Sequence, residues 1–357
     1  MVTKPEGIRR STSPRQLGYH LPAEWELHEA TWLSWPSDLE TWPHELGEVE
    51  ATYVEMIEYL HLGEKVHILV RNRSEEELVF KRLQERGITR NVFLHQIETD
   101  TPWIRDYGPI FIRRKGGRFA LVNWQFNAWG KKYSQFERDN RVPDQIASFL
   151  KLKQYRADMV LEGGSIDVNG LGSGLTTETC LLNANRNPNF KRGDIETYLR
   201  EFLGVHHWIW LQSGISGDDT DGHVDQVARF VGPRTVVVST QDDAHDPDSH
   251  PLQENWKRLS EACDQNGKSL ELVGLPLPKK VFTDGVRLPA SYTNFYIANK
   301  TVLAPIYGGE NDVKALGILK GLFPDRHVVG IPAVPLLYGL GAVHCITQQE
   351  PAIHDES

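Results

Sequence analysis

Five short segments of this chain concentrate ionisable and polar side chains within otherwise apolar surroundings. They are Thr101–Pro109, Leu161–Asp167, Gly217–Gln226, Ala290–Phe295 and Gly339–Gln349. Several of them adjoin strand-like runs, and loops at strand ends commonly carry the active sites of α/β proteins. We therefore expect the reactive residues of this protein among these segments.

Cys345 is a candidate nucleophile, because a thiol can attack a substrate when histidines and acids lie around it. It follows Gly339–Ala342, a flexible run that allows close backbone approach, and it stands next to His344. The alternative is a small buried residue without a chemical role. We interpret Cys180, expected in a strand, and Cys263, expected on the apolar face of a helix, in that second way.

One histidine and three carboxylates are further candidates. His223 and Asp225 stand two residues apart, so on a strand both side chains would point to the same face. Histidine titrates near neutral pH and can act as acid and base in turn. Asp106 and Glu162 adjoin glycine turns and apolar strands, where a buried carboxylate needs a cation beside it. That cation is either a fixed internal one, which makes a structural ion pair, or a bound cationic ligand.

The sequence gives little support for a metal site. If Gly222 is set as the glycine of a calcium-binding EF-hand loop, Gly217 takes the first position and Ala228 the twelfth, and neither supplies a side-chain oxygen. His223, His344 and Cys345 could hold zinc, but the spacings C-x-x-C and H-E-x-x-H do not occur. We therefore expect no bound metal.

Composition narrows the classes of protein. The chain has 357 residues, with 48 acidic and 39 basic side chains and a formal net charge of −9. This charge does not suit a general nucleic-acid binder and suits a cationic substrate. No apolar run approaches the roughly 18 residues of a membrane-spanning helix. Three scattered cysteines and a polar start without a secretory signal lead us to expect a cytoplasmic protein.

Strand-like and helix-like runs alternate along the chain, which predicts an α/β fold. The expected strands are Lys65–Val70, Arg118–Trp124, Trp208–Gln212, Thr235–Thr240, Leu270–Pro276 and Arg326–Pro332. The expected helices are Glu45–Leu60, Ser74–Arg86, Asp194–Leu203, Pro251–Gln265 and Asp312–Phe323. The expected hairpins are Val160–Asn183 and Asn294–Pro305.

The domain organisation follows from the lack of any internal linker. No proline- or serine-rich stretch divides the chain. We predict a flexible polar tail over residues 1–15 and a single catalytic domain over residues 16–353.

At the start of the second predicted helix, Ser74 and Glu77 have the spacing of a capping box.

Taken together, the segments resemble the family of agmatine deiminases and Porphyromonas-type peptidylarginine deiminases, part of the pentein superfamily of guanidino-group-modifying proteins. The resemblance covers Trp32–Pro351 and rests on six ordered motifs. They are W-x-R-D-x-G-P at Trp103–Pro109, E-G-G-S-I at Glu162–Ile166, N-x-N-R-N-P at Asn183–Pro188, G-H-V-D at Gly222–Asp225, S-Y-x-N-F-Y-I at Ser291–Ile297 and H-C-I-T-Q-Q at His344–Gln349.

The resemblance implies a fold and three catalytic roles. The expected fold is a five-bladed α/β propeller, in which ββαβ-type units surround a pseudo-fivefold axis. By likeness to the family, Cys345 is the nucleophile, His223 is the general acid and base, and Glu162 is the acid that orients the histidine.

The same resemblance implies a set of substrate-binding residues. Asp106 and Asp225 correspond to the carboxylates that hold the guanidinium, and Trp103 and Asn294 lie beside the substrate. Paired carboxylates suit this task, because they can bind the planar N–H fork in bidentate fashion. The partner implied is a small cationic guanidino compound, without metal or organic cofactor, nucleic acid or membrane, and a homo-oligomer stays open.

The activity expected from the resemblance is hydrolysis of agmatine to N-carbamoylputrescine and ammonia through a covalent amidino-cysteine intermediate. The alternatives are a deiminase of arginine or of C-terminal peptidylarginine, an amidinotransferase, and a guanidino-binding propeller without catalysis. Agmatine is favoured because the segment Trp32–Trp42, expected at the pocket mouth, holds Asp38 and Glu40 but no lysine or arginine. Tyr107 departs from the agmatine deiminase pattern, which has threonine there, and resembles the peptidylarginine branch.

Overall fold

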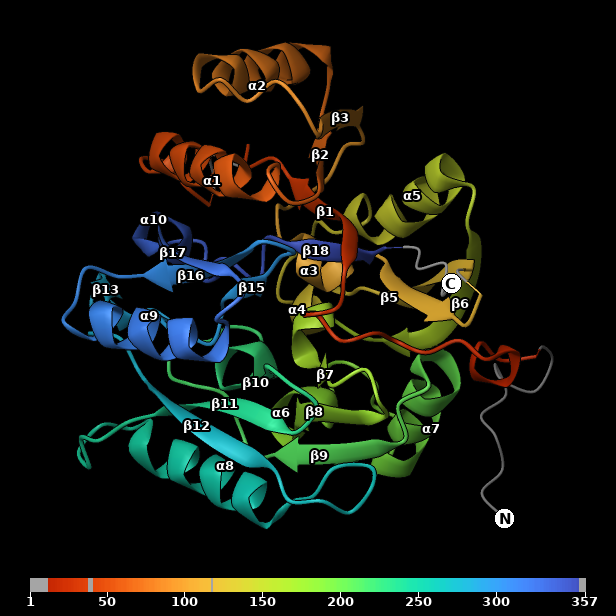
Figure 1. The fold of residues 1–357 in the computed structure, drawn as a ribbon, viewed down its shortest axis with the longest axis vertical. Helices are drawn as coiled ribbons and strands as arrows, with labels where there is room; N and C mark the ends of the chain where they lie inside the picture. The colour runs from red at the N-terminus through yellow and green to blue at the C-terminus, as the bar shows by residue number, and fades with distance from the viewer. Residues whose placement is uncertain (1–11, 38–40, 117, 353–357) are drawn as a thin grey trace.

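The computed structural model describes residues 12–37, 41–116 and 118–352, which form a mixed α/β fold (Figure 1). Residues 1–11 of the predicted tail lie outside the described residues. Near the tail's expected end, Ser13 is buried, and its hydroxyl donates a hydrogen bond of 2.7 Å to Glu201. None of the described helices has the length and apolar character needed to span a membrane.

Five sheets make up most of the strand content. The first contains β18 (Gln348–Pro351), β1 (His28–Ser34), β2 (Lys65–Val70) and β3 (Val92–Gln96). The second contains β4 (Ile110–Arg114), β5 (Arg118–Gln125) and β6 (Lys153–Val160), and the third contains β7 (Asp167–Val168), β8 (Ser173–Thr177) and β9 (His207–Leu211). The fourth contains β10 (Ala228–Phe230), β11 (Thr235–Thr240) and β12 (Glu271–Pro276), and the fifth contains β15 (Tyr296–Ile297), β16 (Thr301–Ile306) and β17 (His327–Pro332).

All five sheets repeat one pairing pattern. Two strands pair antiparallel, and the next strand lies parallel to the middle one. Parallel neighbours need a crossover, which a helix supplies in each unit. These helices are α1 (Leu46–Leu60), α5 (Val142–Leu150), α7 (Arg192–Leu203), α8 (Ser249–Glu261) and α9 (Asn311–Leu322). The first sheet adds α2 (Arg73–Glu85) before β3, and its strand β18 joins the C-terminal end of the chain to β1.

The long helices lie at the outside of the molecule, and the strands run inward from them (Figure 1). Their apolar faces are buried against the sheets, as Val49 and Ile57 of α1 and Leu252 and Leu259 of α8 show. Short elements fill the centre and the connections. They are η2 (Arg15–Leu17), α3 (Ile104–Tyr107), α4 (Ala128–Lys131), η3 (Asp139–Arg141), η4 (Gly163–Ser165), α6 (Glu178–Leu181), η5 (Val224–Gln226), β13 (Phe282–Thr283), β14 (Val286–Arg287) and α10 (Val334–Leu337).

Most of the predicted helices and strands are confirmed, and their observed first residues lie within one or two positions of the predicted ones. Several of them end at a different residue than predicted. The predicted capping box at Ser74 is wrong, because Asn72 caps α2 by accepting a hydrogen bond from the backbone N of Glu75 at 3.1 Å. Asparagine is a strong N-cap, so the helix begins one residue earlier than expected.

Two cysteines lie on other elements than expected. Cys180 is not in a strand, since the side chain of Thr177 ends β8 by capping α6, with the backbone N of Cys180 as donor at 3.3 Å. Cys263 is not on a helix, since α8 ends at Glu261 and Cys263 pairs with Ser269 in an isolated bridge.

Candidate active site

Three short elements meet near the centre of the fold and carry the polar residues of the candidate site. α3 contacts η4, and η4 contacts η5. Gly163 permits the first contact, because a Cβ there would lie 2.2 Å from a backbone carbonyl oxygen of α3. A Cβ on Gly164 would lie 2.6 Å from Nδ1 of His223 and 2.9 Å from a carboxylate oxygen of each of Asp106 and Asp225. The glycine pair therefore allows these three side chains to converge.

Asp106 lies on α3 and faces this meeting point. Its Oδ2 accepts a hydrogen bond of 2.8 Å from the indole of Trp129, and its Oδ1 accepts one of 3.0 Å from the backbone N of Gly164. Burial nevertheless raises the pKa of Asp106 to about 7. A cation bound beside it would favour the ionised form and lower this pKa again.

The backbone that carries Trp129 is strained. Ala128, Trp129 and Lys131 have φ values of 54°, 53° and 64°, in the left-handed region that non-glycine residues adopt at a cost. The side chain of Asn127 stabilises the turn by accepting a hydrogen bond of 2.9 Å from the backbone N of Gly130. No sequence pattern pointed to Trp129, because neither the turn nor its contact with Asp106 is a property of the local residues.

His223 is not on a strand, which corrects the sequence prediction. It immediately precedes η5, and its backbone N donates to the carboxylate of Asp218 at 3.1 Å, a local contact that competes with strand pairing. Its Nδ1 lies 3.7 Å from Oδ1 of Asp106, and its buried Nε2 has no hydrogen-bond partner among the described residues. Burial and the charge of Arg186 lower the pKa of His223 well below its usual value, so the ring is neutral in the empty site.

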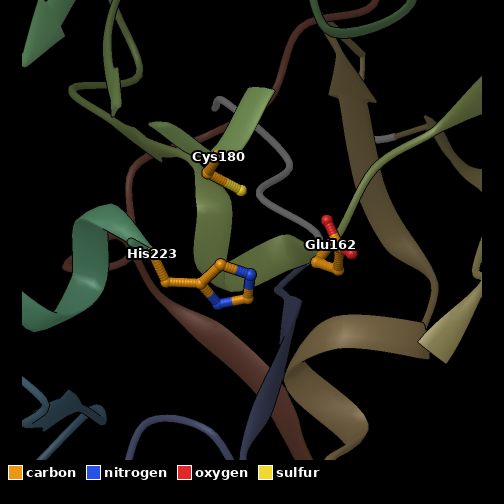
Figure 2. A group of neighbouring side chains, drawn as sticks. All are labelled: Glu162, Cys180 and His223. Atoms are coloured by element: carbon orange, nitrogen blue, oxygen red, sulfur yellow. The ribbon is translucent and has the colours of Figure 1, made fainter. Parts of the chain in front are cut away.

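Glu162 and Cys180 lie beside His223 (Figure 2). One potential ligand atom from each of the three lies within 4.8 Å of the others. Oε1 of Glu162 accepts a hydrogen bond of 2.8 Å from Nε of Arg186, and both of those side chains are fully buried. Oε2 of Glu162 has no partner in the described part of the chain, as is also true of Nε2 of His223. The histidine and the acid predicted to orient it are thus neighbours, each with one free buried atom.

The same trio has the residue types of a metal site, but its surroundings fit that use poorly. A metal ion would have to compete with Arg186 for Glu162. Metals bind thiolate rather than thiol. Burial and the nearby Glu162 raise the pKa of Cys180 well above its usual value, which keeps this thiol protonated.

Cys345 contacts the predicted asparagine directly. Nδ2 of Asn294 lies 3.3 Å from the sulfur, while Oδ1 of Asn294 accepts a hydrogen bond of 2.9 Å from the backbone N of His344. The segment that carries the thiol of Cys345 therefore fixes the orientation of the Asn294 side-chain amide. Burial, then the charges of Asp225 and Asp106, raise the pKa of Cys345 well above its usual value, so the thiol is neutral while the site is empty.

Asp225 stands at one end of a buried chain of polar groups. Its Oδ2 lies 2.7 Å from Nδ1 of His344, and Nε2 of His344 lies 2.8 Å from Oε2 of Glu24. Oδ1 of Asp225 is buried without a hydrogen-bond partner among the described residues. Burial and the nearby Asp106 raise the pKa of Asp225 well above its usual value. The sequence did not point to Glu24, since it lies outside all six of the family motifs.

Cys345 and Asp106 line a cavity of about 410 Å³. Trp103 lines it as predicted, and its ring lies 5.6 Å from that of Trp42. Glycine in the last segment makes room for these rings, because a Cβ on Gly341 would lie 2.3 Å from Trp103. Two further acids line the cavity, and its described lining residues include no lysine or arginine. These acids are Asp100 and Asp219.

The N-terminal segment reaches the cavity only in part. Thr41 lines it, and Trp42 packs behind Trp103. Trp32 lies elsewhere, stacked on His67 with ring centroids 4.3 Å apart, so the prediction that it lies at the pocket mouth is wrong. The predicted Asp38 and Glu40 lie outside the described residues.

The mixed α/β fold thus brings a buried cysteine and Asp106 to one cavity. A neutral histidine, His223, and a second acid, Asp225, lie beside Asp106 but are not among the residues that line the cavity. These groups are typical of enzymes with a cysteine nucleophile. Comparison with known proteins identifies the family. The model of the Porphyromonas-type peptidyl-arginine deiminase family matches residues 20–351. The chain belongs to that family, which confirms the resemblance seen in the sequence.

Individual relatives match along nearly the whole chain. A Legionella pneumophila protein named "Putative agmatine deiminase" is 35% identical over 349 residues, which cover 97% of this chain and 99% of the relative. The structure of agmatine deiminase of Enterococcus faecalis has a TM-score of 0.89 at 33% identity, covering 97% of this chain and 99% of the other. A substrate-bound cysteine-to-serine variant of C. jejuni agmatine deiminase has a TM-score of 0.85 at 33% identity, covering 94% and 97%.

Proposed function

We propose that this protein is a deiminase that hydrolyses agmatine to N-carbamoylputrescine and ammonia. One observation carries the proposal: the thiol of Cys345 and the carboxylate of Asp106 line the same cavity, whose described lining holds further acids and no basic side chain. This arrangement suits a substrate that brings positive charge at both ends. The names of the agmatine deiminase relatives support the same reaction.

Asp106 and Asp225 would bind the guanidinium. Both are buried beside Gly164, and both have raised pKa values in the empty site, mainly because of burial. A guanidinium presents N–H groups in a plane and can pair with carboxylates in bidentate fashion. Its charge would also lower the pKa of the thiol of Cys345, which these same acids raise while the site is empty.

Cys345 and His223 would carry the covalent steps. Neutral His223 accepts the thiol proton, and the thiolate attacks the guanidinium carbon to give a tetrahedral adduct. His223 returns that proton to a terminal nitrogen, the carbon–nitrogen bond breaks, and ammonia leaves an S-alkylthiouronium on Cys345. A water gives one proton to His223 and attacks the same carbon. The carbon–sulfur bond then breaks, the hydroxyl proton of the adduct passes to the departing thiolate, and the neutral ureido product leaves; the proton on His223 is released to ammonia or buffer. Glu162, next to His223, would orient the ring and stabilise its cationic form.

The geometry favours Cys345 over Cys180 as the nucleophile. Cys180 is also close to His223, but it is fully buried and does not line the cavity. Cys345 lines it. The substrate-bound form of the C. jejuni relative carries a cysteine-to-serine substitution, which agrees with a cysteine that is needed for turnover rather than for binding.

The substrate tail is assigned from the charges of the other residues that line the cavity. Agmatine ends in an ammonium, whereas arginine adds a carboxylate, which normally needs a basic partner. Three basic residues that could recognise a carboxylate are engaged elsewhere or do not line the cavity. Arg105 is buried against Glu24 and Gln349. Lys132 pairs with Asp221 at 3.0 Å and with the cavity-lining Asp219 at 3.3 Å, and does not itself line the cavity. Lys131 does not line the cavity.

Tyr107 does not argue against agmatine. Its hydroxyl donates a hydrogen bond of 2.7 Å to the backbone carbonyl of Thr101, and its ring packs on Phe126 with centroids 5.9 Å apart. It is buried and does not line the cavity, so it cannot select the substrate by contact.

The repetition of one pairing pattern in five sheets also supports the expected five-bladed propeller as the scaffold of this site.

The test is an assay of the purified chain with agmatine, free arginine and an arginine-terminated peptide, in buffer without any acceptor amine. We expect ammonia and the ureido product from agmatine. Turnover of the peptide alone would replace agmatine with the substrate that the family description names. Formation of product only after addition of an acceptor amine would identify an amidinotransferase instead.

A further inference from the structure

The imidazole of His344 lies between two carboxylates, with one ring nitrogen facing each. Nδ1 is 2.7 Å from Asp225 and Nε2 is 2.8 Å from Glu24, and the residue is 2% exposed. A neutral imidazole carries one N–H, and an ionised carboxylate carries none. Two hydrogen bonds at these distances need two protons. The chain of three groups therefore holds one more proton than a neutral histidine between two carboxylates would supply.

Glu24 does not hold this additional proton. Its Oε1 lies 2.8 Å from Nη2 of Arg229, and its Oε2 lies 3.5 Å from Nη2 of Arg105. Although burial opposes ionisation, Arg229 and His344 hold the pKa of Glu24 well below its usual value. Glu24 is thus a fixed carboxylate that accepts from Nε2 of His344.

In the empty site the additional proton lies on Asp225. Asp225 faces a second acid, Asp106, and burial together with that acid raises its pKa well above the usual value. Burial, then the charges of Arg105 and Arg229, lower the pKa of His344. Oδ2–H of Asp225 therefore donates to Nδ1 of His344 before substrate enters.

We propose that Glu24 and His344 form a relay that takes up the proton of Asp225 when a guanidinium binds. The inference rests on the proposed function, in which Asp225 faces that cation. The guanidinium charge stabilises the carboxylate of Asp225, the O–H bond breaks, and an N–H bond forms at Nδ1 along the existing hydrogen bond. The imidazolium then lies between two carboxylates, and no proton leaves the protein in this step. Glu24 and His344 are positioning residues, since neither lines the cavity of Cys345 and Asp106.

The relay has a consequence that a purely structural role would not have. With His344 in place, Asp225 passes its proton to the imidazole, and no proton is exchanged with solvent. Without it, the same proton must be released to the buffer as the guanidinium binds. Affinity then falls by about tenfold for each unit of pH below the pKa of Asp225, because binding is linked to loss of one proton.

The experiment counts protons released on binding. Agmatine is titrated into Cys345→Ser protein by calorimetry, in buffers of different ionisation enthalpy, with and without the additional substitution His344→Gln. The serine background removes turnover and the thiol proton. We expect the His344→Gln protein to release about one more proton than its background. Glu24→Gln should have the same effect, because it removes the charge that stabilises the imidazolium. Any proton that Asp106 releases or retains on binding is the same in both proteins, so it cancels when their proton release is compared.

His67→Gln is the matched control, because His67 is also buried, its pKa is lowered to about 3 by burial, and it does not line the cavity. It should release the same number of protons as the background. Equal proton release from the His344→Gln and background proteins would overturn the relay. Lack of any agmatine binding to the background would instead contradict the proposed function.

A second measurement follows the protonation of His344 directly, without and with ligand. Nitrogen NMR of histidine-labelled protein, assigned through His344→Gln, should show one protonated and one unprotonated ring nitrogen for His344 in the empty protein. Saturation with agmatine should convert this pattern to that of an imidazolium. An imidazolium in the empty protein, or a neutral ring in the saturated protein, would rule the relay out.

Discussion

Nδ2 of Asn294 lies 3.3 Å from Sγ of Cys345, and both residues are buried. Asn294 precedes β15 in the fifth unit, whereas Cys345 follows α10. The backbone N of His344 donates both to the side-chain Oδ1 of Asn294, at 2.9 Å, and to its backbone carbonyl, at 3.0 Å. The thiol therefore has a fixed direction before substrate arrives. It also remains protonated, since burial and two acids raise its pKa.

Replacement of this thiol tests the nucleophile. Cys345→Ser should bind agmatine but release no ammonia, because a serine hydroxyl is a far weaker nucleophile than a thiolate. Mass spectrometry of the wild type quenched during turnover should find the covalent adduct on the peptide that carries Cys345. Cys263→Ser is the control and should keep normal activity. Loss of activity in Cys180→Ala with normal turnover in Cys345→Ser would move the nucleophile to the other cysteine.

Removal of one carboxylate charge tests the guanidinium site. Asp106→Asn and Asp225→Asn should each weaken transition-state binding by roughly 1.5–3 kcal/mol, the usual range for a charge-assisted hydrogen bond. That corresponds to about ten- to a hundredfold in kcat/KM. Glu162→Gln should lower kcat more than it raises KM, because the acid acts on His223 rather than on the substrate. Wild-type kinetics in all three variants would show these acids to be structural.

The raised pKa of Asp106, about 7, predicts an acidic limb in the activity profile. Below that pH the group is neutral in the free protein and cannot pair with a guanidinium, so kcat/KM should fall as the pH decreases through about 7. The direction follows from the sign of the shift, since burial favours the protonated acid. Asp106→Asn should lack this limb at its lower overall rate. Loss of activity with one proton changes kcat/KM roughly tenfold per pH unit. A wild-type profile that is flat from pH 5 to 8 would therefore refute the assignment.

The substrate tail can be tested at Asp219, which lines the cavity and accepts a hydrogen bond of 2.8 Å from Tyr133. We expect agmatine to exceed free arginine by at least about tenfold in kcat/KM, a difference of roughly 1.4 kcal/mol. Asp219→Asn should reduce this preference by removing a negative charge. Equal or better turnover of arginine by the wild type would exclude the assignment of the tail while leaving the deiminase chemistry in place.

Gly164 tests the packing of the site. Gly164→Ala would place a methyl group 2.6 Å from His223 and 2.9 Å from Asp106, so these side chains must shift. A displacement of this kind should cost roughly a hundredfold or more in kcat/KM. Gly317→Ala is the control, because Gly317 is exposed on α9 with nothing near its Cβ position. It should keep full activity and gain about 1 kcal/mol in the free energy of unfolding. Full activity of Gly164→Ala would contradict the observed convergence.

The sequence alone determined the elements whose signals are local. The strands Lys65–Val70 and Thr235–Thr240 have the predicted bounds, and the predicted hairpin Asn294–Pro305 contains β15 and β16, which pair antiparallel. Alternating apolar residues and turn residues act within a few positions, so they can be recognised without a fold. The ordered motifs also indicated the family, because each motif preserves residue types that a guanidino site needs.

Only the tertiary structure decided how these residues interact. Glu24 and His344 are 320 positions apart, yet their side chains share a hydrogen bond of 2.8 Å. Trp129 reaches Asp106 through a left-handed turn that no local pattern predicts. The pKa shifts of Asp106, Asp225 and Cys345 arise first from burial, which depends on every segment packed around the site. Residue types are fixed by the sequence, whereas desolvation and charge–charge contacts act through space and exist only once the chain has folded.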